Sequence, residues 1–269
     1  MEIPTTVDNV KKGRILTLAL IISISILIFK VTQTTDIVNP IVVLLRSLVY
    51  FAVAYVGLIW AFKFQVTLHS LLYILPQSAM FIMSEVIFLE MFFFRRVGRV
   101  YEILILVGML ILLFIGTYVV FLMSNVFNVA TVKEIPLIQA ARTVSFLATL
   151  IATFFLALGL LDGNLDIIPT TLILAFAFFS LVFFHLKHMD LGKERLGEYT
   201  ILVLLFMLSM FISTAIVSQS HEVIALAPTI GAFVALEIIT KKQRNMLTPF
   251  TILQYIFFIT AIFVAAFVI

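Results

Sequence analysis

The feature of this sequence that most constrains its fold is a series of nine long, continuously apolar segments. Each is near or above the roughly 20 residues that an α-helix needs to cross a bilayer. None alternates between apolar and polar residues, which excludes a transmembrane β-barrel. The sequence therefore predicts an all-α, polytopic transmembrane helix bundle of about nine spans, at residues 15–29, 37–62, 66–94, 101–123, 137–161, 167–186, 199–218, 223–239 and 249–269.

The composition supports this class. Hydrophobic residues make up 63% of the chain and charged residues only 12%, whereas about 25% of the residues of a soluble domain are charged. The connections between the segments are short, so we expect residues 1–269 to form a single transmembrane domain with residues 1–12 as a polar tail. The chain has no cysteine, which excludes disulfides, thiolate metal sites and a cysteine nucleophile.

The distribution of lysine and arginine predicts the orientation. Most of these residues fall in connections that are cytoplasmic if the N-terminus is inside, so we expect the N-terminus inside and the C-terminus outside. Short basic runs between apolar spans are topology signals and do not indicate a nucleic-acid surface. The sequence RRVGR at 95–99 is the exception. It leaves open an alternative in which segment 66–94 folds back at Pro76 without crossing.

Segment 66–94 is unusual because it carries polar side chains inside a membrane span. Successive residues of an α-helix are about 100° apart around its axis, which places five of these polar side chains within roughly a third of the helix circumference. Pro76 predicts a kink in this helix. Such a stripe has to face protein or a wet cavity, so buried polar packing and a path for a solute or ion both remain open. The stripe consists of Ser70, Tyr73, Gln77, Ser84 and Glu85, and we take it, with Arg46, as the candidate binding site.

Two arginines inside spans predict ion pairs. Arg46 and Glu85 lie at similar depths on adjacent antiparallel spans, roughly 5 to 7 Å outward of the span centres. An unpaired charge near the middle of the bilayer costs about 2.5–3.5 kcal/mol, so we expect these two groups to pair. The same depth argument predicts a structural ion pair between Arg142 and Glu237. Snorkelling of either arginine toward the nearer span end remains the alternative.

No cluster of side chains predicts catalysis. His185, His188 and Asp190 could be taken for metal ligands, since the two histidines have a spacing that zinc could use. No further ligand is evident, however, and basic neighbours favour an interfacial cluster. Asp162 and Asp166 lie in a turn-forming sequence. The sequence therefore predicts no catalytic residue, no metal site and no cofactor, and it does not favour an enzyme.

Two pairs of spans resemble each other. The sequence RSLVYFAVAYVGLIW from Arg46 is similar to RTVSFLATLIATFFL from Arg142, and YEILILVGML from Tyr101 is similar to YTILVLLFML from Tyr199. A repeat of three spans would be inverted in the membrane, as in secondary transporters, whose sites lie at the repeat interface. The alternative is that apolar helices resemble one another through composition alone.

Residues 124–156, SNVFNVATVKEIPLIQAARTVSFLATLIATFFL, resemble a family of uncharacterised polytopic membrane proteins from uncultured small-genome bacteria. The resemblance covers a small part of the chain, and its motif carries no known chemistry. It implies a location in the bacterial cytoplasmic (inner) membrane and nothing about a site.

The sequence leaves two main hypotheses for function. The first is a transporter of a small solute or ion, which should show a water-filled cavity that reaches Gln77 and Glu85. The second is a non-catalytic scaffold, assembly factor or sensory domain that acts through a membrane-protein partner, in which side chains should enclose those groups. An intramembrane enzyme that acts on a lipid is the least favoured. In each case we expect the chain to lie in the lipid bilayer and to bind no nucleic acid.

Overall fold

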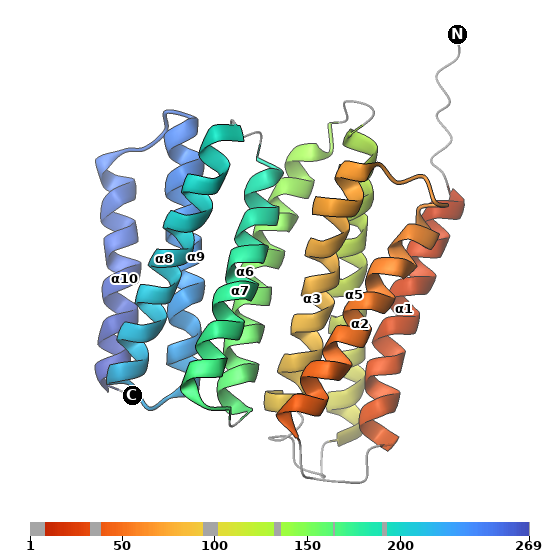
Figure 1. The fold of residues 1–269 in the computed structure, drawn as a ribbon, viewed down its shortest axis with the longest axis horizontal. Coiled ribbons are helices and arrows are strands. Elements are labelled where there is room, and N and C mark those ends of the chain that lie inside the picture. Colours follow the sequence, from red (N-terminus) through yellow and green to blue (C-terminus); the bar gives the residue numbers. More distant parts are fainter. Residues whose placement is uncertain are drawn as a thin grey trace.

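The computed structural model describes residues 9–32, 39–93, 102–131, 136–163, 165–189 and 193–268. Within these ranges, nine helices are long and apolar enough to cross a membrane, which confirms the predicted all-α polytopic bundle. The helices run alternately up and down, and α1 begins and α10 ends at opposite faces of the bundle (Figure 1). We call these the N-terminal face and the C-terminal face. The helices are α1 (Asn9–Thr32), α2 (Pro40–Ala61), α3 (Leu75–Phe88) between the π-helical turns η1 (Ser70–Ile74) and η2 (Leu89–Phe93), α5 (Glu102–Ala130), α6 (Ile138–Asp162), α7 (Ile167–Lys187), α8 (Lys193–Val217), α9 (His221–Gln243) and α10 (Pro249–Val268).

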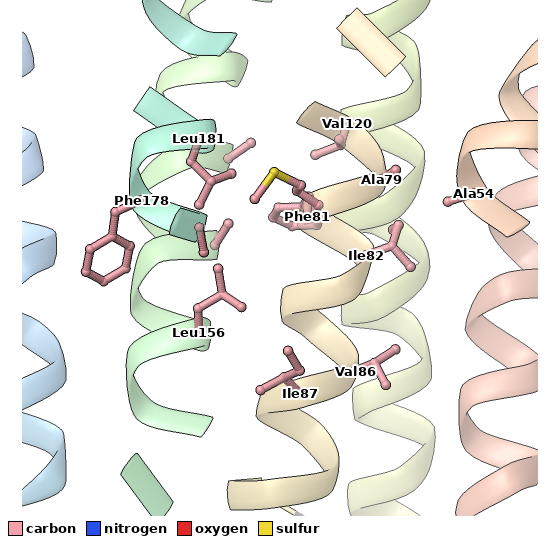
Figure 2. Close-up of a cluster of buried hydrophobic side chains, with 14 of the residues drawn as sticks. Ala54, Ala79, Phe81, Ile82, Val86, Ile87, Val120, Leu156, Phe178 and Leu181 are labelled. Atoms are coloured by element: carbon pink, nitrogen blue, oxygen red, sulfur yellow. The ribbon is translucent and has the colours of Figure 1, made fainter. Parts of the chain in front are cut away.

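Helix α3 is the central helix of the bundle. In the apolar stretch of its span, Ser70–Phe93, 67% of the residues are buried, whereas 22% are buried in the spans formed by α2, α5 and α10. It packs against α2, α5, α6 and α7. Figure 2 shows α3 with Leu156 of α6 and Leu181 of α7 on one side and Val120 of α5 on the other. The helix extends through the height of the bundle (Figure 1), so the alternative in which this segment folds back at Pro76 is wrong.

A π-helical turn lies directly before Pro76, where the sequence predicts a kink. Proline lacks an N–H, and its ring crowds the carbonyl group four residues earlier in the chain. The turn before it, η1, is wider than an α-helical turn, because the N–H of Leu75 donates to the carbonyl oxygen of Ser70. A second π-helical turn, η2, follows α3 at Leu89–Phe93. Such turns are rare and often occur at functional sites.

Close packing between α3 and α6 depends on Gly159. A Cβ atom at this position would lie 2.8 Å from Cγ2 of Ile87 and 3.0 Å from its carbonyl oxygen. Small residues allow transmembrane helices to approach closely, and dispersion contacts then stabilise the pair. Gly159 therefore holds the backbone of α6 against that of α3.

The first segment is an integral part of the bundle. Helix α1 packs against α2 and α5 and buries Ile15, Ala19 and Ile22 completely. At the other end of the molecule, α10 packs against α9 and α8. The proposed inverted repeat stays a prediction, and Tyr101 lies outside the residues that the structure describes.

Candidate functional site

Gln77 is the centre of a buried, neutral hydrogen-bond network between α3, α6 and α7. Its Nε2 donates to Ser145 Oγ at 2.7 Å and to Thr149 Oγ1 at 3.2 Å. Ser145 Oγ in turn lies 3.0 Å from Nδ1 of His185. Oε1 of Gln77 is buried and has no hydrogen-bond partner among the described residues. The network links three helices without using a formal charge.

His188 lies where this network approaches the N-terminal face. Its ring stacks on Phe127 with the ring centroids 4.3 Å apart, and its carbonyl oxygen accepts a hydrogen bond from Arg142 Nε at 2.9 Å. The pKa of His188 is lowered to about 3, chiefly by burial and to a smaller extent by repulsion from His185, His69, Arg142 and Lys187. His188 is therefore neutral at physiological pH.

A third histidine, His69, is near enough to His188 to affect its charge. Partial burial lowers its pKa, and the charge of Lys187 acts in the same direction. No three His, Asp or Glu side chains in the described part of the chain lie together as metal ligands would. Asp190, which the sequence pairs with His185 and His188, lies outside the described residues.

Glu85 lies in the C-terminal half of the stripe and contacts α5. Its Oε2 accepts a hydrogen bond from Thr117 Oγ1 at 3.2 Å. Gly116 provides space for the carboxyl group, since a Cβ there would lie 3.3 Å from Oε1 of Glu85. Ser84 makes no such contact, because its hydroxyl donates to the carbonyl oxygen of Phe81 in its own helix at 2.6 Å.

Arg46 forms an ion pair with Glu90, so the predicted pair with Glu85 is wrong. The guanidinium group contacts the Glu90 carboxylate and lies over the ring of Phe29, 3.7 Å from its centroid. Helix α2 begins at Pro40, which puts Arg46 about 9 Å along the axis from the C-terminal face. Glu90 lies in η2, close to the same face. The arginine therefore reaches toward the span end, as long basic side chains do in membranes.

The predicted pair of Arg142 and Glu237 does not form between these two described residues. Helices α6 and α9 do pack together, with the rings of Phe146 and Phe233 6.0 Å apart. Glu237, however, faces α10, where its carboxylate lies 3.4 Å from the hydroxyl of Tyr255. It also lies 3.8 Å from Nζ of Lys241, one turn further along α9.

The remaining stripe residues have separate neighbours. Ser70 contacts Thr67 at 2.9 Å between hydroxyl oxygens. Tyr73 is half-buried, with Lys187 Nζ 4.9 Å from its ring centroid. The structure thus brings the members of the stripe to different helices, and none of them lines the three cavities found among the described residues.

The cavity beside α3 lies on another side of this helix. It has a volume of about 620 Å³ and opens between α2 and α7. Pro76, Met80, Met83 and Ile87 contribute its α3 wall, and the lining is apolar apart from the hydroxyls of Ser47 and Ser180. Gln77 and Glu85 do not line it.

Sequence reasoning missed a polar cavity at the N-terminal face. Its volume is about 670 Å³, and it lies where α6, α8 and the end of α9 meet. From the sequence alone, most of its basic residues are interpreted as topology signals. The signal that could have indicated the cavity is that they fall on the same predicted side of the membrane and on neighbouring spans. The lining residues are Arg142, Met189, Arg195, Tyr199, Thr240, Lys242, Gln243, Arg244 and Asn245.

Comparisons of the chain with protein-family models, with curated proteins and with solved structures found no match.

Proposed function

We propose that this multi-pass membrane protein is a non-catalytic membrane component, such as a scaffold, assembly factor or sensory domain, that acts through a membrane-protein partner. The observation that carries the proposal is the enclosure of its polar stripe. Gln77 is 1% exposed and Glu85 is 3% exposed. Polar groups on a solute path have to reach water, whereas polar groups that hold helices together are enclosed by them.

The polar contacts of the stripe fit this role. Gln77 joins α3 to α6, and Glu85 joins α3 to α5. Interhelical hydrogen bonds in membranes contribute about 0.6 kcal/mol each on average. In this proposal, the polar core therefore fixes the arrangement of the helices, and recognition takes place at the surface of the bundle.

A second candidate is a transporter of a small solute or ion, which the sequence favours. It is supported by Glu85, an ionisable group inside a span whose hydrogen-bond partner in the described chain is a neutral hydroxyl. The π-helical turns at both ends of α3 also support it, because helices bend at such turns. In this candidate, the present arrangement is a closed state, and Glu85 exchanges an ion when a path opens.

Cysteine labelling distinguishes the two candidates, since the chain has no cysteine of its own. Ser84→Cys places a thiol on α3 beside Glu85, and the protein is labelled in membranes with a membrane-impermeant maleimide. A scaffold leaves this thiol unlabelled from both sides and labelled only after denaturation in SDS. Labelling of native protein from one side, together with solute flux in proteoliposomes, would support the transporter instead.

Two exposed positions provide the controls. Gln65 lies in the connection after α2 at the N-terminal face, and Gln219 lies between α8 and α9 at the C-terminal face. In intact cells, we expect the reagent to reach Gln219→Cys and not Gln65→Cys, if the N-terminus is inside the bacterial cytoplasmic membrane. The reverse pattern would overturn the proposed orientation.

A further inference from the structure

The polar cavity at the N-terminal face has the chemistry of an anion-binding site. Four of its lining residues are basic: Arg142, Arg195, Lys242 and Arg244. No carboxylate belongs to the described lining of the cavity. Within the part of the chain that the structure describes, Arg195, Lys242 and Arg244 form no ion pair. Three cations thus converge there, and no described carboxylate pairs with them.

An apolar groove of about 380 Å³ continues from this cavity. It lies between α8, α9 and α10. Tyr199 and Lys242 line both the cavity and the groove, so the two spaces adjoin. Aliphatic side chains dominate the rest of the groove, including Val203, Ala235 and Ile256.

We propose that the cavity and the groove together bind one anionic phospholipid. The phosphate lies among the cations of the cavity, and one acyl chain lies in the groove. Basic pockets between transmembrane helices bind anionic lipid head groups in this way. The inference does not depend on whether the protein is a scaffold or a transporter, because it uses none of the residues of the polar stripe.

The length of the groove fits a lipid of one leaflet. It extends from Tyr199 to Phe206 on α8 and from Lys242 to Val234 on α9, which is about 10 to 12 Å along the helix axes. Half of the hydrocarbon core is about 15 Å thick. The groove therefore starts at the N-terminal face and ends near the middle of the bilayer, as an acyl chain anchored at that face does.

Membrane topology alone would also explain the positive charge of the cavity. Basic residues near helix ends set the orientation of the protein in the membrane, and they complement the negative C-terminal end of α9. That explanation requires neither an adjoining apolar groove nor a preference for one lipid. The test therefore has to separate a specific site from general attraction between a basic face and anionic lipid.

Lipid retention by the purified full chain tests the proposal. The protein in detergent is mixed with phosphatidylglycerol or phosphatidylcholine of the same chain length, and bound lipid is counted by native mass spectrometry. We expect one phosphatidylglycerol to be retained at least about tenfold more tightly than phosphatidylcholine. Equal retention of the two lipids would overturn the proposal.

A pair of variants separates the site from general charge. Arg195→Gln/Lys242→Gln/Arg244→Gln removes three positive charges from the cavity. Lys11→Gln/Lys12→Gln/Lys63→Gln removes three charges at a distance from it, from α1 and the connection after α2. We expect at least about tenfold weaker retention for the first variant and less than about twofold for the second. Equal loss in both would mean that only surface potential attracts the lipid, and the proposal would be wrong.

A third variant tests the groove and distinguishes a lipid from a free phosphate. Ile252 lines the groove and is 44% exposed, so Ile252→Trp narrows the groove without replacing a fully buried side chain. We expect weaker retention of phosphatidylglycerol and unchanged binding of glycerol phosphate. If glycerol phosphate displaces the lipid at equal concentration and Ile252→Trp has no effect, the site is for a soluble anion and the lipid proposal is wrong.

Discussion

The two halves of the central span bury polar side chains in different ways. Toward the N-terminal face, Gln77, Ser145 and His185 form one neutral chain of contacts that crosses three helices. Toward the C-terminal face, Glu85 and Glu90 lie five positions apart in the sequence and have separate partners on different helices. Amides and hydroxyls both donate and accept hydrogen bonds and can therefore form a chain, whereas a carboxylate only accepts and ends one.

This difference determines how each half responds to substitution. Removing one member of a neutral network costs a hydrogen bond and the desolvation of what remains. Removing one member of a buried ion pair leaves an uncompensated charge, which is more expensive. We therefore expect the Arg46–Glu90 ion pair to give the largest change in stability. We expect Glu85, whose hydrogen-bond partner in the described chain is a neutral hydroxyl, to give the smallest.

The largest effect is expected at the ion pair. Arg46→Met removes the guanidinium group that contacts the Glu90 carboxylate near the membrane span end, and we expect a loss of roughly 3 kcal/mol in the free energy of unfolding. Arg46→Met/Glu90→Met removes both charges and should recover most of this loss. Unfolding in mixed micelles measures both. If the double variant is as unstable as the single variant, lost packing and not an unpaired charge is the cause.

The next largest change in stability is expected on acidification, through His188 in the half of the bundle toward the N-terminal face. Because burial lowers the pKa of His188 to about 3 from 6.5, the folded state binds fewer protons than the unfolded state between these values. The stabilising contribution is fully present above pH 6.5 and is lost as the pH falls toward 3. We expect a loss on the order of 1 to 2 kcal/mol by pH 5, measured as unfolding against pH.

His188→Phe is the matched variant for this prediction, because phenylalanine keeps a ring to stack on Phe127 and cannot be protonated. Its stability should fall less steeply between pH 6.5 and pH 5. Part of the slope should remain, since the pKa of His69 is also lowered. An unchanged slope in His188→Phe would show that other groups cause the acid sensitivity.

Gln77 should show a smaller effect. Gln77→Leu removes the donor to Ser145 and Thr149, and we expect a loss of about 1 kcal/mol in the free energy of unfolding. Ser84→Ala is the control, because Ser84 bonds only within its own helix among the described contacts and should change stability by less than about 0.5 kcal/mol. Equal effects at the two positions would mean that the network does not join the helices.

Much of the fold could be predicted because its signals are local. The apolar runs indicated the number of spans, and the polar stripe from Ser70 to Glu85 indicated that this side of the third span faces protein or a wet cavity and not lipid. The ion pairs could not be predicted in the same way. Depth along an axis follows from counting residues, but the direction of a side chain depends on rotation about the axis. Two π-helical turns flank α3, and each departs from the assumed 100° per residue.

The basic cavity illustrates the same limit. Arg142, Arg195 and Lys242 come from three helices, and each has an ordinary explanation when the sequence is read alone. Their convergence depends on α6 and α8 both packing beside α9, which no single segment encodes. Glu237 shows the reverse case, since the helices predicted to touch do touch, while its carboxylate points to α10.

The smallest effect is expected at Glu85, and it sharpens the comparison with Glu90. In Glu85→Gln, the amide oxygen can still accept the hydrogen bond from Thr117, and no cation loses its partner. We expect the free energy of unfolding to change by less than about 0.5 kcal/mol. Glu90→Gln is the matched substitution, since it makes the same chemical change five positions further along the span and leaves Arg46 without its carboxylate. We expect it to cost more than about 1.5 kcal/mol.

The two glutamate variants also bear on function. In a scaffold, Glu85→Gln should fold, insert and bind partners as the parent chain does at any pH. In a transporter that uses Glu85 to exchange an ion, the same variant should remain stable but lose solute flux in proteoliposomes, while flux by the parent chain should depend on pH. Loss of stability in Glu85→Gln to the level of Glu90→Gln would contradict both, because it would mean that Glu85 is a charged group with an essential cationic partner.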